Sequence, residues 1–189
     1  MSEVSIANRA LALLGENKIT SLTDETQAAK AINNVYKDSL KSILSECCWS
    51  FAKKRVNLNM LTTKPAWGGG NYFQLPADMV AIFRATTDKY ELEGDKLITD
   101  EKEIGILYTY LNTDSSMYSP AFVDAFACRL AYDVCYDLTN NKSKQDDLLS
   151  LYTGQFLPIA KSKNARNNLR DNRIQDDAWI NAIYGGVNG

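Results

Sequence analysis

Histidine is absent from this 189-residue sequence, and cysteine is sparse. Without an imidazole the chain has no Ser-His or Cys-His nucleophile pair, no histidine metal ligand and no histidine pH switch. The four cysteines include no Cys-x-x-Cys pair, the spacing that zinc knuckles need; they are Cys47, Cys48, Cys128 and Cys135. We expect them to be buried, reduced thiols. These absences disfavour most catalytic chemistries, so we expect no enzyme activity, no metal and no cofactor.

Long hydrophobic runs are missing as well. No segment approaches the ~20 apolar residues that span a bilayer. Residues 1–6 lack the basic and apolar regions of a secretory signal, so we expect synthesis in the cytoplasm and no membrane partner. The triple glycine at 68–70 lacks the Lys and Ser/Thr that follow a phosphate-binding loop, which predicts a flexible loop instead.

Neither sign of charge dominates the chain as a whole. Lys and Arg (21) nearly balance Asp and Glu (23), for a net charge of -2, so the whole chain is not a polyanion-binding protein. The balance conceals two opposite segments. Residues 88–103 hold seven acids and three lysines, an excess of -4, and residues 161–173 hold five cations and one acid, an excess of +4. Each segment is either a solvated surface, as charge runs commonly are, or a contact site.

The first 45 residues have the apolar period of helices. Apolar side chains recur at helical spacing from Ile6 to Leu14, and Gly15 supplies a C-cap. A second apolar stripe runs through residues 28–44. Asp24, with Gln27 three residues later, predicts a capping box at the start of this second helix.

From Lys53 the apolar period shortens to two, which is typical of strands with one buried face. Alternation is clear in Val56, Leu58 and Met60 and again in residues 104–110, and Glu93-Gly94-Asp95 predicts a hairpin turn. Short spacings and turn residues between these segments indicate an antiparallel β module of about five strands.

The helical period returns at Ser119-Pro120, which predicts an N-cap followed by proline at the first helical position. The helix that follows, about 19 residues long, is apolar over a wide arc, so we expect it to be central. Ser143, with acids at 146 and 147, predicts the start of another helix. Pro158 should kink or restart that helix.

This order of elements predicts an α+β fold. Residues 1–52 and 119–169 should form a bundle of about four helices, with the β module (residues 53–118) inserted and an extended tail at 170–189. Helices far apart in sequence must pack together if their apolar stripes are to be covered.

The C-terminal arm, residues 161–184, combines cations with apolar side chains. Its basic residues are Lys161, Lys163, Arg166, Arg170 and Arg173. The apolar residues that follow at helical spacing are Trp179, Ile180, Ile183 and Tyr184. A polar tail this short cannot bury these side chains by itself, which favours an anchor on a partner surface. The alternative is that the arm folds back on its own domain.

Motifs for chemistry are weak. The acidic pairs at 24–25, 146–147 and 176–177 are neighbours in sequence, whereas a glycosidase needs two carboxylates that face one cleft. Basic residues interleaved with aromatics, the pattern of nucleic-acid binding, occur only where Lys53-Lys54-Arg55 follows Trp49 and Phe51. We expect these two aromatic side chains to pack where the bundle meets the sheet.

An ordered series of residues in the first third of the chain resembles a known family. The series is Asn8-Arg-Ala-Leu-Ala-Leu-Leu-Gly15, Ile19-Thr-Ser-Leu22, Asp24, Ala28, Tyr36, Leu40, Trp49-Ser-Phe-Ala52, Arg55 and Leu58. It continues through Tyr72-Phe-Gln-Leu-Pro-Ala-Asp78 and loosely through residues 160–166. The pattern resembles the tail tubular protein A family, the head-to-tail adaptor (connector) proteins of short-tailed bacteriophages. The tail here departs from the family in having no basic residue after Arg173.

The resemblance implies a helical bundle with a β domain and a non-enzymatic ring, twelvefold in the family, in the neck of the virion. Such a ring binds the portal protein, carries the tail tube or nozzle protein and lets DNA pass. A subunit of pI about 5.2 suits that passage, since basic linings would bind DNA by counterion release. The family's C-terminal helix docks on the portal, which implies the same for the arm. A hairpin with these acids would face a neighbour or the tail: Glu91, Glu93, Asp95, Asp100 and Glu101.

Two rival hypotheses come from other classes of protein. One is a virion-associated glycosidase that degrades peptidoglycan, and the other is a small nucleic-acid-binding domain.

Overall fold

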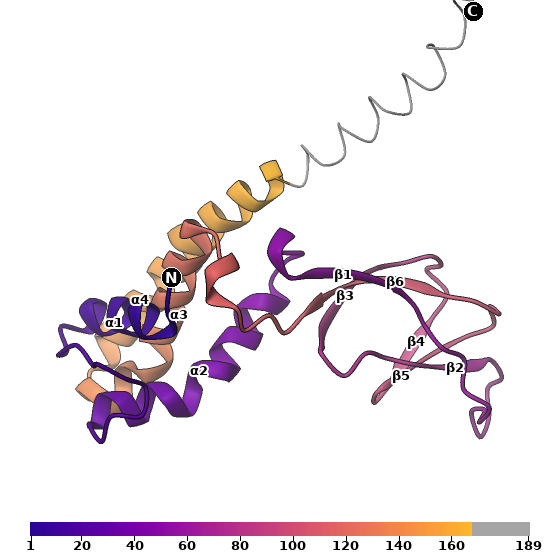
Figure 1. Cartoon of the computed structure of the whole chain (residues 1–189), viewed down its shortest axis with the longest axis horizontal. Helices are drawn as coiled ribbons and strands as arrows, with labels where there is room; N and C mark the ends of the chain where they lie inside the picture. Colours follow the sequence, from indigo (N-terminus) through magenta and orange to yellow (C-terminus); the bar gives the residue numbers. More distant parts are fainter. Residues whose placement is uncertain (168–189) are drawn as a thin grey trace, which may run out of the picture. The chain divides into compact units, whose positions relative to one another are not determined.

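The computed structural model describes residues 1–167. The described chain divides into two compact units, one formed by Met1–Tyr36 with residues 116–167 and the other by Lys37–Ser115. The boundary falls inside α2 (Gln27–Ser45), so one helix contributes to both units. The α+β class predicted from the sequence is confirmed (Figure 1). Predicted positions from residue 168 onward, including Arg170, Arg173 and the apolar part of the arm, lie outside the described residues.

The first helix, α1 (Glu3–Leu14), forms as predicted. The Ser2 side chain caps its N-terminus by accepting a hydrogen bond from the backbone N–H of Ser5. Gly15 ends the helix with φ +75°, a left-handed conformation that glycine adopts without a Cβ penalty. The buried face of α1 packs on α3.

The predicted capping box at α2 is wrong. The Thr26 hydroxyl accepts the hydrogen bond from the Ala29 N–H at 3.2 Å, so Thr26 caps the helix. The Asp24 carboxylate instead accepts hydrogen bonds from the backbone N–H groups of Thr20 (2.8 Å) and Ser21 (3.1 Å). These bonds lower the pKa of Asp24, the Ser21 bond most. The short Asp side chain closes the preceding turn because that turn offers nearer backbone donors.

The central helix, α3 (Pro120–Thr139), begins as predicted, with the Ser119 hydroxyl accepting from the Phe122 N–H. Eleven of its residues are buried, which confirms that it is central. The Tyr36 ring of α2 meets the Phe126 ring edge-on, with centroids 5.1 Å apart. Cys128 and Cys135 are buried free thiols as expected, and burial raises the pKa of Cys128 to about 11, whereas Cys47 and Cys48 are only half-buried, so the expectation of burial is wrong for them.

The last described helix contains a wide turn. It begins as α4 (Lys142–Leu151), and Asn141, not Ser143, is its N-cap, since the Asn141 side chain accepts from the Lys144 N–H at 3.0 Å. A π turn, η3 (Tyr152–Phe156), follows, and helical backbone then continues through residues 157–167. Pro158 therefore does not end the helix. Proline lacks the N–H for the preceding turn, and the π turn takes up that irregularity.

The β unit contains six strands, so the expected count of about five is wrong. They are β1 (Lys53–Asn57), β2 (Asn71–Gln74), β3 (Met79–Ala85), β4 (Glu91–Glu93), β5 (Lys96–Thr99) and β6 (Gly105–Tyr110). They form two antiparallel three-stranded sheets, ordered β1-β6-β3 and β2-β5-β4, which face each other in Figure 1. Short 3-10 turns, η1 (Ser50–Ala52) and η2 (Ser115–Met117), flank this unit's strands.

Both sheets contribute to one apolar core. Its buried members are Leu58, Phe73, Leu75, Leu97, Ile104, Ile106 and Tyr108. Two short sheets form, rather than one, because each has a single apolar face that must be covered. Because side chains alternate along a strand, the residues between the core members point to the outer faces of this sandwich.

Candidate functional site

The described part of the C-terminal arm is helical. Lys163 and Arg166 are exposed on it, whereas Lys161 is half-buried. The opposite side of the same helix is buried through Leu157, Ala160 and Asn164, whose spacing follows the helical period. The basic part of the arm therefore starts on a helix that is anchored on its own unit.

The predicted acidic hairpin forms between β4 and β5. Glu93 pairs with Lys96 across a two-residue loop, Gly94-Asp95. Gly94 has φ +61° while Asp95 stays outside the left-handed region, which is the pattern of a type II′ turn. Glu91 and Glu93 lie on one face of β4 because they alternate with Leu92.

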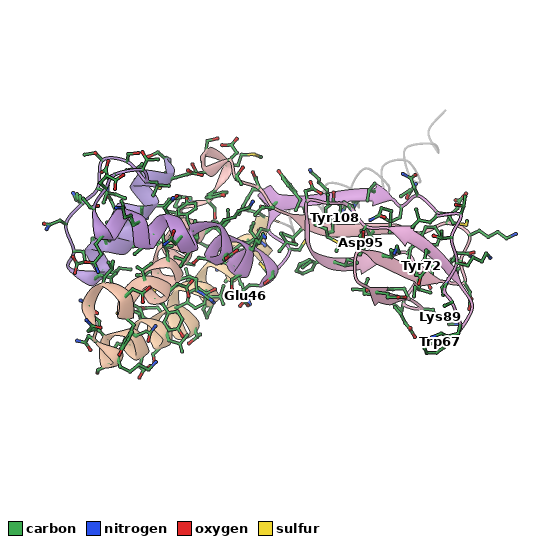
Figure 2. The ribbon with its side chains drawn as sticks, turned by 90° about the horizontal axis from the view of Figure 1, so that it is seen from below. Glu46, Trp67, Tyr72, Lys89, Asp95 and Tyr108 are labelled. Atoms are coloured by element: carbon green, nitrogen blue, oxygen red, sulfur yellow. The ribbon has the colours of Figure 1, made fainter. Side chains whose placement is uncertain are left out.

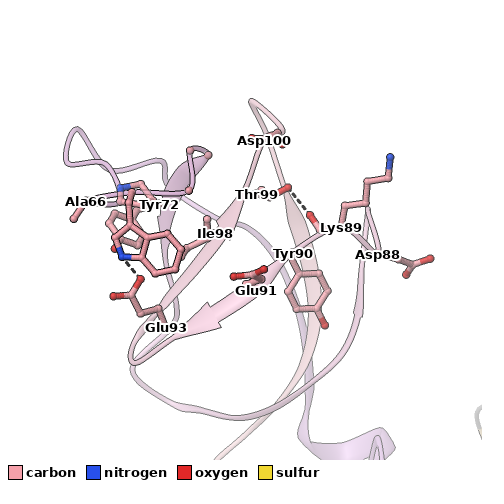
Figure 3. Close-up of a pocket in the computed structure, with 15 residues that line it drawn as sticks. Ala66, Tyr72, Asp88, Lys89, Tyr90, Glu91, Glu93, Ile98, Thr99 and Asp100 are labelled. Carbon is pink, nitrogen blue, oxygen red and sulfur yellow. Dashed lines mark hydrogen bonds between the residues drawn. The ribbon is translucent and has the colours of Figure 1, made fainter.

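An acidic recess of about 580 Å³ opens over the outer face of sheet β2-β5-β4. Four carboxylates and one ammonium line it, from Asp88, Glu91, Glu93, Asp100 and Lys89. Three aromatic side chains also line it, those of Trp67, Tyr72 and Tyr90. Figure 3 shows Glu91 and Glu93 near the rings of Tyr72 and Tyr90, with Asp88 at the edge of the group, and Figure 2 shows Trp67 and Lys89 at the same end of the β unit. Two predicted acids do not line it: Asp95 accepts from the Gln74 side chain, and Glu101 lies beyond β5.

Trp67 is the most exposed large apolar side chain of the described chain, at 88%. It lies on the loop that carries the triple glycine. All three glycines have positive φ, and Gly70 passes so close to β5 that a Cβ there would lie 3.0 Å from the Ile98 side chain. The loop path over the recess thus depends on glycine, and an exposed indole on such a loop is typical of a contact residue.

Two hydrogen bonds hold the walls of the acidic recess. The Tyr72 hydroxyl donates to the Glu93 carboxylate at 2.8 Å, which is the main reason that the pKa of Tyr72 is raised. The Thr99 hydroxyl donates to the Lys89 carbonyl at 2.7 Å and so fastens the 86–90 loop to β5. Both bonds are drawn in Figure 3.

A basic row lies on the outer face of the other sheet. Arg55 of β1 and Arg84 of β3 both pair in register with Leu107 of β6, so the three side chains share one face. Both arginines are exposed, and they line a groove of about 250 Å³ with Leu107. Neither forms an ion pair within residues 1–167.

The predicted basic cluster Lys53-Lys54-Arg55 is divided between two faces. Lys53 and Arg55 share the outer face, whereas Lys54 pairs with Tyr108 on the inner one. The Lys54 ammonium lies 2.6 Å from the Asp78 carboxylate and 3.9 Å from the centre of the Tyr110 ring.

The Trp49 indole is fully buried and donates to the Ile43 carbonyl at 2.9 Å. Trp49 is therefore a core residue and not a base-stacking platform.

The described residues hold no group of three or more Cys, Asp or Glu side chains placed to bind a metal ion. None of the helices within residues 1–167 is long and apolar enough to cross a membrane. Of the acidic pairs singled out in the sequence, Asp24 closes a turn and Asp146 pairs with Lys142 at 3.0 Å. The pair at 176–177 lies outside the described residues.

Sequence reasoning missed Trp67, Tyr90 and Arg84. A large apolar residue between Pro65 and three glycines was a usable signal for Trp67, since breakers on both sides leave it little to pack against. No local sequence signal marks Arg84, because its place in the basic row depends on the pairing of β3 with β6.

A comparison with protein-family models finds no match for the chain, and neither does a comparison with curated protein sequences.

Proposed function

We propose that this chain is a structural head-to-tail connector of a short-tailed bacteriophage. Copies of the chain would form a ring, twelvefold in the family that the sequence resembles, in the neck of the virion. The ring would bind the portal protein on one side and the tail tube or nozzle protein on the other. DNA would pass through its channel without sequence-specific binding.

The observation that carries this proposal is the ordered series of residues in the first third of the chain. Several members of the series have structural tasks that explain their identity. Asn8 fastens the segment after α1, Tyr36 packs on Phe126, and Trp49 is fully buried. The series thus marks a particular way of building this helical unit and its link to the strands, which supports a relationship in fold.

The distribution of charge also supports an interaction protein. Acidic and basic side chains collect on separate exposed surfaces of the β unit, and Trp67 stands exposed beside the acidic one. A connector must touch several different neighbours, and separate surfaces of opposite charge suit that task.

The portal-docking role of the arm is tested by truncation. Deletion of residues 174–189 should weaken binding to the portal protein of the same virion in a pull-down or sedimentation assay, because the apolar anchor is removed. Deletion of residues 185–189 alone keeps Trp179, Ile180, Ile183 and Tyr184 and should bind like the full chain. Undiminished binding by the longer deletion would overturn the docking role, and a subunit count in intact particles tests the ring itself.

One observation favours a glycosidase as the second candidate. The acidic recess places several carboxylates beside aromatic rings, as sugar-binding clefts do. However, Asp88, Glu91, Glu93 and Asp100 are all exposed, whereas a glycosidase acid works in a site that partly excludes water. Incubation with purified peptidoglycan should release no reducing sugar. Release that is lost in Glu91→Gln would instead establish the enzyme.

A further inference from the structure

The β unit has two outer faces of opposite charge. Its two sheets share one core, so the outer faces of sheet β1-β6-β3 and sheet β2-β5-β4 lie on opposite sides of the sandwich. The first carries the basic row of Arg55, Leu107 and Arg84. The second carries the acidic recess. A head-to-tail contact joins two different surfaces of each subunit, and opposite charges on opposite sides suit such a contact.

The basic row is available to a partner of opposite charge. Both guanidinium groups are exposed and have no ion pair within the described chain. Burial is the larger effect on the nearby Cys48 thiol and raises its pKa, whereas the cations Lys53, Arg55 and Arg84 act to lower it. Leu107 lies between the arginines, so the row offers an apolar centre with a charged rim.

The acidic recess matches this row in chemistry. Asp88 and Glu91 line it without an ion pair within residues 1–167. Carboxylates hold guanidinium groups by paired hydrogen bonds, and aromatic faces stack on them. Trp67, Tyr72 and Tyr90 supply such faces.

We propose that the basic row of one copy docks in the acidic recess of the next copy, so that β units join head to tail. This inference rests on the proposed ring, because a ring is built from heterologous contacts between two different surfaces of each subunit. A two-fold contact through either surface would instead bring like charges together, which costs free energy. A second copy is therefore the occupant that the charges of both surfaces favour.

Sedimentation velocity of the full chain tests the contact. Self-association should weaken between about 0.1 M and 1 M NaCl, because the screening length falls from roughly 10 Å to 3 Å. Arg55→Glu/Arg84→Glu and, separately, Asp88→Lys/Glu91→Lys should each weaken association by at least about tenfold. Trp67→Ala should weaken association while leaving thermal unfolding unchanged.

Mixing the two charge-reversal variants gives the decisive result. Each variant keeps one intact surface, and the two reversed surfaces are again complementary, so the mixture should associate where neither variant does alone. Matched controls with the same change in net charge are Lys18→Glu/Lys37→Glu and Asp38→Lys/Asp147→Lys, at exposed positions. Both controls should associate like the unmodified chain.

Three results would overturn the contact. They are an unmodified chain that stays monomeric at every protein and salt concentration, charge-reversal variants that associate like their controls, and a mixture of the two variants that stays monomeric.

Salt-sensitive binding of single-stranded DNA that only the arginine reversal abolishes would assign the basic row to nucleic acid instead. Portal binding by an unmodified chain that stays monomeric would keep the connector and remove this interface. Self-association without portal binding would do the reverse.

Discussion

The side chain of Asn8 holds both backbone polar groups of Ile19. Its amide oxygen accepts from the Ile19 N–H at 2.8 Å, and its amide nitrogen donates to the Ile19 carbonyl at 2.9 Å. Ile19 itself is buried, at 5% exposure. A side chain that mimics a paired strand in this way fixes the course of the segment that leaves α1. Asn8 also belongs to the ordered series of residues on which the proposed function rests.

Asn8→Ala should lower the free energy of unfolding by about 1–3 kcal/mol, because both backbone groups of Ile19 lose their partner in a partly buried place. Asn8→Asp keeps the acceptor and loses the donor, so its free energy of unfolding should lie between that of the unmodified chain and that of Asn8→Ala. Urea unfolding followed by circular dichroism measures the change. Asn33→Ala, at an exposed position of α2, is the control, and a loss as large at Asn33 as at Asn8 would contradict the assignment.

Lys54 and Asp78 should make stability depend on pH at both extremes. Their hydrogen bond is the main cause that lowers the pKa of Asp78 and raises that of Lys54. The contribution of Asp78 is therefore complete above its ordinary pKa and disappears as pH falls through the lowered value. That of Lys54 is complete below its ordinary pKa and disappears as pH rises through the raised value.

The pair is nearly half exposed, so its loss should cost only about 0.2–1 kcal/mol at neutral pH. Asp78→Asn should remove part of the acid-side decline when unfolding free energies are measured from pH 2 to 7. Asp38→Asn, which changes the same charge on an exposed helix position, should leave that decline in place. An unchanged acid limb in Asp78→Asn would count against the ion pair.

Tyr36→Phe should leave stability unchanged or raise it by up to about 1 kcal/mol. The Tyr36 hydroxyl is buried and has no hydrogen-bond partner within the described chain, and an unpaired buried hydroxyl is unfavourable. Burial is also the main reason that its pKa is raised. The ring contact with Phe126 remains in phenylalanine.

Tyr36→Ala provides the comparison, since it removes the ring and should cost about 3–5 kcal/mol. Thermal unfolding of the two variants separates the value of the ring from that of the hydroxyl. A marked loss of stability in Tyr36→Phe would show that the hydroxyl is hydrogen-bonded in solution.

Gly70→Ala should be more harmful than Gly69→Ala. Both glycines have positive φ, so alanine at either position should cost about 1–3 kcal/mol of backbone strain. Only at Gly70 would the new Cβ also meet the Ile98 side chain at 3.0 Å, whereas at Gly69 it meets open space. Adding Ile98→Ala should therefore recover part of the loss at Gly70, as a double-mutant cycle would measure. Equal losses at the two glycines would argue against the close approach to β5.

The local part of the fold was readable from the sequence. Gly15 and Ser119-Pro120 mark helix ends because their signals act within one turn of the chain. The prediction at Asp24 was wrong because two nearby hydrogen bonds competed with it. The Asp24 carboxylate binds the Thr20 N–H in the preceding turn, and Thr26 caps the helix in its place. Which local hydrogen bond wins depends on backbone geometry that composition does not reveal.

The sequence by itself also determined the excess of acids at 88–103 and the lack of histidine. Only the tertiary structure decided where the charges act. Arg55 and Arg84 both pair with Leu107, and Trp67 lines the same recess as Glu91, although these residues are far apart in sequence. Strand register and sheet packing are non-local: a one-residue shift in a strand would turn Arg55, Arg84 or Glu91 to the other face of its sheet. The physical reason is that pairing between distant strands, and not the period within one strand, selects which side chains share a surface.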